Sequence, residues 1–214
     1  MIRQIWARLW PLFSRFTTSS DYWKKRYQFG GNSGFGSRNQ FAEYKAKVVN
    51  HILEAHNIQD AIEFGCGDGH QLGMIRYQQY LGLDISPDAV KLCREAYGDD
   101  PGKRFQLLDD YDGAPAEITV SMDVIYHLVE DEIFESHMAA LFNHATRFVL
   151  IYSSNCSSGA AIQLPHVRHR VFSEWIDKHQ PTWKRQALDV QQIASSPPYD
   201  SKTRAEFFLF ENNR

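Results

Sequence analysis

Short apolar runs alternate with amphipathic segments along most of the chain beyond residue 40. This alternation predicts strands joined by helices, which is typical of a mostly parallel sheet with helices on both faces. The apolar runs predict strands over 60–65, 79–84, 104–108, 118–123, 147–153, 184–190 and 205–211. The amphipathic segments predict helices over 41–56, 70–76, 87–97, 131–145 and 171–179. Because no helix is predicted between the last two strands, we expect a C-terminal antiparallel hairpin.

The first 38 residues follow a different pattern. Apolar residues recur at helical spacing through residues 1–20, with arginines among them, and a loop rich in glycine and serine follows over 30–37. We therefore divide the chain into residues 1–38, with an amphipathic helix and a glycine-rich lid, and a domain of residues 39–214. A basic, aromatic helix can lie in a membrane interface or pack on a second subunit. Residues 1–20 are thus a candidate for peripheral contact with the inner membrane face or for a homodimer contact.

Composition and charge argue against several classes of protein. A formal net charge of −3 over 214 residues argues against nucleic-acid binding through bulk positive charge. The three cysteines form neither a redox pair nor a zinc-like spacing, which indicates reduced thiols. No apolar run approaches the ~20 residues that a membrane-spanning helix needs, and the N-terminus has no secretory signal pattern. We expect a cytoplasmic protein.

The most informative motif is a glycine-rich turn at the end of the first predicted strand. Gly65, Gly67 and Gly69 alternate there, and a second apolar run ends on Asp84, nineteen residues after the first glycine. Glycines allow a tight turn and a close approach of the backbone to a ligand. An acid at the end of the second strand can accept hydrogen bonds from ribose hydroxyls. The motif therefore predicts a nucleotide-type cofactor at the carboxyl edge of the sheet.

The spacing of the motif distinguishes between cofactors. A dinucleotide fingerprint reads G-x-G-x-x-G, whereas this chain reads E-x-G-x-G-x-G. Glu63 and Asp68 flank the turn, where they would repel a pyrophosphate and suit a cationic amine and a sulfonium. In this motif, and over roughly residues 40–214, the chain resembles the class I S-adenosylmethionine-dependent methyltransferases. The resemblance implies a Rossmann-like α/β fold with seven strands, S-adenosyl-L-methionine as cofactor and S-adenosyl-L-homocysteine as product.

The resemblance also implies roles for individual residues. Glu63 and Asp68 would lie with the three glycines beside the methionine moiety, and the strand acid would hold the amine directly or through water. Asp84 would bind the ribose, and Ile85 would lie beside the adenine. Asp109, at the end of the third predicted strand, would accept the adenine amino group. The alternative for Asp109 is a solvated turn.

Two residues at and just beyond the end of the fourth predicted strand are candidates for proton transfer. The carboxyl end of this strand faces the transferred methyl group in the resembling family, which places Asp123 and His127 near the acceptor. Histidine suits this role because its pKa lies near the working pH. The alternative is structural, with Asp123 capping the strand and His127 supporting the loop. Methyl transfer also depends on alignment of the reacting atoms, so a base need not be essential.

A basic loop after the fifth predicted strand is the candidate substrate site. Arginines and histidines suit a phosphate or carboxylate group, and the loop offers no paired carboxylates for a metal. The candidate residues are His166, Arg168 and His169 of this loop, together with Tyr126, which follows the fourth predicted strand. The glycine-rich loop over 30–37 resembles that of small bacterial methyltransferases of surface-glycan pathways, which favours a sugar or a phosphorylated metabolite as acceptor.

The sequence thus predicts a methyltransferase that acts on an oxygen, or a nitrogen, of a small molecule or glycan precursor. Two other classes stay open. A nicotinamide-dependent oxidoreductase is disfavoured by the missing dinucleotide spacing. A methyltransferase-like subunit without catalysis would keep the fold and bind only cofactor or a partner protein. One fold hosts many acceptors, so the fold does not identify the substrate.

Overall fold

A seven-stranded sheet forms the centre of the computed structural model, which describes residues 16–157, 164–194 and 204–213. The strand order is β3-β2-β1-β4-β5-β7-β6; neighbours among β1 to β5 are parallel, and β7 is antiparallel to both of its neighbours. The strands are β1 (Asp60–Phe64), β2 (Gln79–Asp84), β3 (Lys103–Leu107), β4 (Ala116–Met122), β5 (Ala145–Ser154), β6 (Trp183–Gln186) and β7 (Ala205–Asn212). The mostly parallel sheet with an antiparallel C-terminal pair is therefore confirmed.

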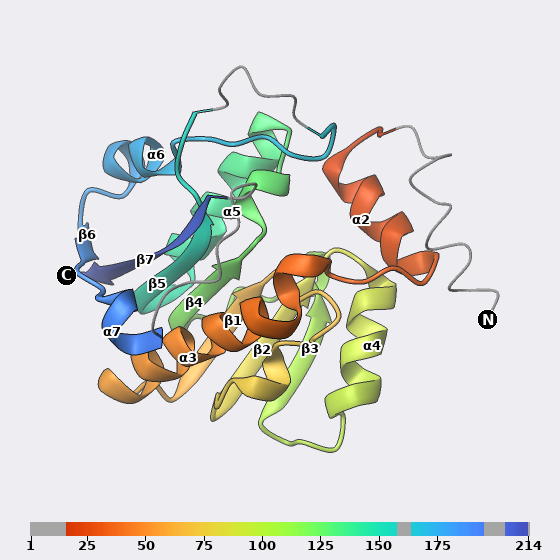
Figure 1. Cartoon of the computed structure of the whole chain (residues 1–214), viewed down its shortest axis with the longest axis horizontal. Helices are drawn as coiled ribbons and strands as arrows, with labels where there is room; N and C mark the ends of the chain where they lie inside the picture. Colours follow the sequence, from red (N-terminus) through yellow and green to blue (C-terminus); the bar gives the residue numbers. More distant parts are fainter. Residues whose placement is uncertain (1–15, 158–163, 195–203, 214) are drawn as a thin grey trace.

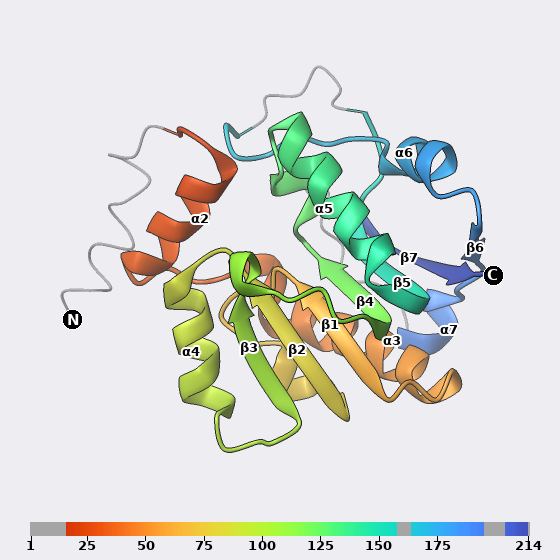
Figure 2. The same ribbon diagram turned by 180° about the vertical axis from the view of Figure 1, so that it is seen from behind.

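Helices cover both faces of the sheet (Figures 1 and 2). One face packs on α3 (Asn39–Ala55), α4 (Pro87–Tyr97) and α7 (Val190–Ala194), and the other packs on α5 (Asp131–Asn143) and α6 (Phe172–His179). Alternate residues of one strand point to opposite faces. In β5, Phe148 and Leu150 join the core under α3, whereas Val149 and Ile151 join the core under α5. Burial on both faces explains why the central strands read as continuous apolar runs.

The predicted helix over 70–76 is wrong. This segment forms turns and a single 3₁₀ turn over Leu72–Met74. Gly69 has a φ of 70°, and Gly73 lowers the helix propensity further. The side chain of Asn50 in α3 donates to the carbonyl of Met74 at 2.9 Å. The backbone is thus held by tertiary contacts in place of a helix.

The predicted strand over 184–190 is also only partly right. The strand ends at Gln186, and α7 follows before β7, so the last two strands are not joined without a helix. The carboxylate of Asp189 accepts the N–H of Gln192 at 3.0 Å, which starts the short helix. β6 and β7 nevertheless pair as predicted.

An additional helix, α2 (Ser19–Gln28), crosses the carboxyl edge of the sheet (Figure 1). Thr18 caps its N-terminus by accepting the N–H of Asp21 at 3.1 Å. The amphipathic helix predicted within residues 1–20 lies mostly outside the described residues, and the membrane or dimer contact stays a prediction. None of the helices in the described ranges combines the length and apolar character that crossing a bilayer requires.

Candidate active site

A cavity of about 540 Å³ opens at the carboxyl edge of the sheet, beside the ends of β1, β2 and β4. Residues of α2 and of the glycine-rich loop form part of its wall, and residues of α5 form another part. A cavity of this size suits a cofactor or another small molecule. Eight residues that the sequence predicted for the site line it: Gly65, Gly67, Asp68, Asp84, Ile85, Asp109, Asp123 and His127.

The turn after β1 has backbone conformations that favour glycine. Gly65, Gly67 and Gly69 have φ values of 89°, 59° and 70°. A Cβ on Gly65 would lie 2.5 Å from Cγ2 of Val124, and one on Gly67 would lie 2.4 Å from Oγ of Ser33. The turn therefore packs against the segment after β4 and against the glycine-rich loop, and larger residues would push them apart.

Asp84, the last residue of β2, has unused acceptor capacity. Its Oδ2 accepts the N–H of Gly67 at 3.0 Å, and its Oδ1 accepts the N–H of Ser86 at 2.9 Å. Since the two oxygens of a carboxylate can accept about four hydrogen bonds, Asp84 retains acceptor capacity for a hydroxyl. Burial raises the pKa of Asp84 to about 6, although the backbone N–H groups of Ser86, Gly67 and Ile85 act to lower it. The carboxylate is therefore mostly ionised at neutral pH and suits a pair of ribose hydroxyls.

One buried acceptor in the cavity wall has no hydrogen-bond partner among the described residues. It is Oε1 of Gln71, just beyond the glycine turn. Leaving a buried acceptor unsatisfied costs about 1–3 kcal/mol. A ligand N–H would offset that cost, so Gln71 is a candidate partner for an ammonium group. Sequence analysis missed it, because nothing in the pattern separates it from an ordinary turn residue.

Asp68 connects the glycine turn to the glycine-rich loop. Its carboxylate accepts the N–H of Ser33 at 3.2 Å and the hydroxyl of Ser33 at 2.9 Å, and it forms an ion pair with Arg38. The hydroxyl of Tyr27 in α2 lies 2.8 Å from Oγ of Ser33. Asp68 thus lies at the cavity as predicted, but its contacts are with protein groups that hold the loop in place.

Glu63 lies outside the cavity wall, so the structure does not bring it together with the other predicted residues. The side chain is buried in β1, where it accepts the hydroxyl of Tyr80 at 2.7 Å. Burial raises the pKa of Glu63 to about 7, against the opposing effects of Tyr80 and Lys45. Its role in cofactor binding stays a prediction.

We expect Glu63→Gln to stabilise the protein above pH 7. The pKa of a glutamate in an unfolded chain is about 4.3, and that of folded Glu63 is about 7. Between these values the folded state binds more protons than the unfolded state, so stability falls as the pH rises. Glutamine keeps an acceptor for Tyr80 without the charge and should remove a penalty of roughly 3 kcal/mol. Urea unfolding at pH 5 and pH 8 measures this, and an equal effect at both pH values would contradict it.

Asp123, directly after β4, is fixed at the cavity wall by two partners. It forms an ion pair with Lys45, whose side chain is 0% exposed, and it accepts the hydroxyl of Tyr126 at 2.8 Å. Its φ of 60° is unusual for a residue with a side chain. The N–H of Asp123 donates to the carbonyl of Tyr152 at 2.9 Å, which helps to hold this conformation. The predicted base is therefore in place, with one partner on each carboxylate oxygen.

His127 lies in the cavity wall with one ring nitrogen in use. Its Nδ1 lies 2.9 Å from the carbonyl oxygen of His166, so Nδ1 carries the proton and Nε2 is left as an acceptor. Burial lowers the pKa of His127 to about 4, although the hydrogen bond to His166 acts to raise it. The ring of Trp23 in α2 packs edge-on against it, with centroids 4.9 Å apart. His127 is therefore neutral at working pH.

The predicted substrate-binding cluster does not line the cavity. The ring of His166 stacks on that of Tyr22 in α2, with centroids 4.3 Å apart. Arg168 forms an ion pair with Asp131 of α5, at 3.1 Å. These contacts fasten the loop after β5 to α2 and α5. The residues that lie outside the cavity wall are Tyr126, His166, Arg168 and His169.

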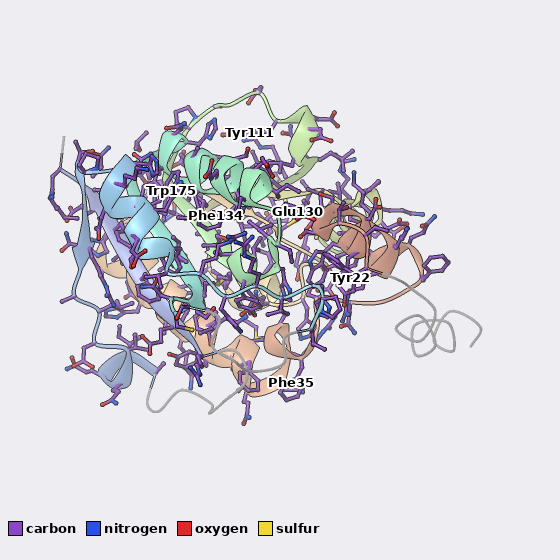
Figure 3. The ribbon with its side chains drawn as sticks, turned by 90° about the horizontal axis from the view of Figure 1, so that it is seen from above. Tyr22, Phe35, Tyr111, Glu130, Phe134 and Trp175 are labelled. Carbon is purple, nitrogen blue, oxygen red and sulfur yellow. The ribbon has the colours of Figure 1, made fainter. Side chains whose placement is uncertain are left out.

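Sequence analysis missed the contribution of α2 to the site. Ser19, Trp23 and Tyr27 of α2 line the cavity. Ser19 anchors the helix to the segment before α5, because its N–H and its hydroxyl donate to the carboxylate of Glu130 at 3.0 and 2.6 Å. Figure 3, seen from above, labels Glu130 and Tyr22 at this junction. The helical spacing of Trp23 and Tyr27 was the available signal.

Comparisons with known proteins identify the fold. No protein-family model and no curated protein matches the sequence. The solved N-methyltransferase NodS from Bradyrhizobium japonicum WM9, in complex with S-adenosyl-L-homocysteine, matches with a TM-score of 0.66 and 10% identity over 92% of this chain and 100% of that chain. This chain has the methyltransferase fold.

Two further structures agree with that assignment. Magnesium protoporphyrin IX methyltransferase (ChlM) from Synechocystis PCC 6803, with bound S-adenosylmethionine, has a TM-score of 0.61 and 14% identity over 94% of this chain and 100% of that chain. The methyltransferase domain of bacterial CtHen1 has a TM-score of 0.62 and 15% identity over 82% of this chain and 100% of that chain. At these identities the likeness concerns the fold.

Proposed function

We propose that this protein is an S-adenosylmethionine-dependent methyltransferase that acts on an oxygen or nitrogen of a small molecule, glycan precursors included. The observation that carries the proposal is Asp84. This carboxylate lies at the end of β2 in the cavity wall, is mostly ionised at neutral pH and keeps hydrogen-bond acceptor capacity beyond its backbone donors. The glycine turn beside it and the methyltransferase fold support the same function.

The cavity wall offers a partner for each part of the cofactor. Asp84 suits the ribose hydroxyls, and the unpaired oxygen of Gln71 suits the ammonium group. Ile85 and Leu108 line the same cavity with apolar surface, which suits the adenine ring. Asp109 also lines it and makes no hydrogen bond within the described part of the chain, so its carboxylate can accept the adenine amino group.

When bound, the cofactor supplies an electrophilic methyl group on a sulfonium. The residues of this chain enclose and orient the reaction. Trp23 and Tyr27 line the cavity from α2. The neutral Nε2 of His127 can accept a hydrogen bond from the molecule that is methylated. This hydrogen bond would hold the reacting atom of that molecule in line with the methyl group and the sulfur. Such alignment accounts for a large part of the rate in transfer reactions.

We expect calorimetry to detect S-adenosyl-L-homocysteine binding and no binding of NAD⁺. The turn around Asp84 and Asp68 is rich in hydrogen-bond acceptors. We expect it to bind the ammonium and ribose groups of the cofactor and to repel a pyrophosphate. A dissociation constant of about micromolar, with one ligand per chain, is the expected result. Binding of NAD⁺ but not of S-adenosyl-L-homocysteine would favour the oxidoreductase class, and binding of neither would favour a subunit without catalysis.

A further inference from the structure

The cavity wall is acidic. Among the described residues that line it there is no lysine or arginine, and five carboxylates are present: Asp68, Asp84, Asp109, Asp123 and Glu132. Arg38 and Lys45 form ion pairs with Asp68 and Asp123 but do not line the cavity themselves. The other three carboxylates form no ion pair within the described part of the chain. Since S-adenosylmethionine carries a single net positive charge, the cavity stays negative when the cofactor is bound.

Several groups near the cavity that could bind an anion already have partners within the protein. Arg26 stacks over the ring of Trp23, 5.4 Å from its centroid, and its Nε donates to the carbonyl of Asn32 at 2.6 Å. The N–H of Ser33 donates to Asp68, and the N–H of Gly34 donates to the side chain of Asn32 at 2.8 Å. The glycine-rich loop therefore does not present these two amides to a phosphate. Among the described residues, these contacts give no support to the predicted anionic acceptor.

The cavity also lacks a strong base in the places where the sequence predicted one. Burial lowers the pKa of His127 to about 4, and it does the same for His137 of α5. The oxygens of Asp123 accept from Lys45 and Tyr126. Both acceptors need to lose a proton, but an ammonium group gives its proton to water far more readily than a hydroxyl does, so nitrogen can attack without a strong base. The available groups therefore favour nitrogen over oxygen.

The wall between α2 and α5 suits a molecule that combines a ring with a positively charged ammonium group. Trp23 offers an aromatic surface, and Leu128 and Ile133 offer apolar surface. Glu132 lies in the first turn of α5, two residues beyond Glu130, the anchor of α2. An aromatic ring and a carboxylate both stabilise a bound ammonium group.

From the charge and the contacts of this wall, we infer that the acceptor is an amine on an apolar, ring-bearing small molecule and that the methylated atom is nitrogen. This inference rests on the proposed function. The bound ammonium group first loses a proton to water, and the neutral amine then forms the new N–C bond with its lone pair while the C–S bond breaks and leaves its electron pair on sulfur. The product is a methylated ammonium ion, which the carboxylates stabilise and which then releases a proton to water.

Three probes with one ring and different charges test the inference: benzylamine, benzyl alcohol and benzoate. Each is titrated into the full-length protein saturated with S-adenosyl-L-homocysteine. We expect benzylamine to bind about tenfold more tightly than benzoate, a ratio set by the sign of the charge. With S-adenosylmethionine present, mass spectrometry should detect N-methylbenzylamine and no methyl ether. A preference for benzoate, methylation of the alcohol, or no binding of benzylamine would overturn the inference. Failure to bind S-adenosyl-L-homocysteine would instead refute the proposed function.

A matched pair of variants in α5 tests whether the preference for benzylamine comes from this part of the cavity wall. Glu132→Gln removes one carboxylate from the cavity wall and should weaken benzylamine binding about three- to fivefold, as expected for an exposed charge pair, with benzyl alcohol unaffected. Glu135→Gln changes an exposed residue of the same helix that does not line the cavity, and it should have no effect on either probe. Equal effects of the two variants on benzylamine would contradict an acceptor site at this wall.

Discussion

Lys45→Ala is expected to lower the free energy of unfolding by about 3–5 kcal/mol, the cost of removing one partner from a buried ion pair. The ammonium group of Lys45 is 0% exposed and pairs with Asp123, whose side chain is 13% exposed. It also lies 5.2 Å from the centroid of the Tyr152 ring. Without it, the carboxylate of Asp123 would be left in a largely desolvated position with only Tyr126 as donor. Urea unfolding followed by circular dichroism measures the change.

Three further variants identify the cause of that loss. Lys47→Ala changes an exposed lysine of the same helix and should shift stability by no more than about 0.5 kcal/mol. Lys45→Met with Asp123→Asn removes both charges and keeps most of the volume, so it should be more stable than Lys45→Met alone. If the single and double variants were equally unstable, the loss would come from packing and not from the unpaired charge.

Asp84→Asn is expected to weaken S-adenosyl-L-homocysteine binding about 10- to 100-fold, because hydrogen bonds to a charged group contribute about 1.5–3 kcal/mol. The substitution keeps the shape of the side chain but removes its charge and replaces one acceptor oxygen with an N–H₂ donor. In the wild-type protein the N–H groups of Gly67 and Ser86 donate to the carboxylate. The new N–H₂ group would face one of these donors and lose that hydrogen bond. Since the pKa of Asp84 is raised to about 6, wild-type affinity should also fall as the pH drops below 6.

The control is Asp99→Asn, which removes the same charge from an exposed residue away from the cavity. It should leave both the affinity and its pH dependence unchanged. If Asp84→Asn bound the ligand as tightly as this control, Asp84 would not contact the ribose. The main observation behind the proposed function would then no longer support it.

The sheet and the glycine turn could be predicted because short stretches of sequence determine them. The apolar runs mark strands that are buried on both faces, and Gly65 and Gly67 stand where the backbone needs a positive φ. The errors fall where tertiary contacts replace local preference. Asn50 holds the segment near Met74 in a turn, and Asp189 starts a helix where the apolar pattern suggested a strand.

The partners of the site residues could not be read from the sequence, because they lie far apart along the chain. Lys45 and Asp123 are 78 positions apart, and Ser19 and Glu130 are 111 positions apart. Local pattern identified Asp123 as a candidate base but gave no sign of the lysine that holds it. The basic loop around Arg168 looked like an anion site for the same reason, since its partner Asp131 comes from another element.

A crystal structure of the protein with S-adenosyl-L-homocysteine tests the central claim most directly. The account predicts one ligand in the cavity beside the glycine turn, with the ribose hydroxyls on Asp84 and the ammonium group on Oε1 of Gln71. The homocysteine sulfur should face His127 and Trp23, where the acceptor is proposed to bind. A ligand outside this cavity, or one whose ribose does not contact Asp84, would contradict the account.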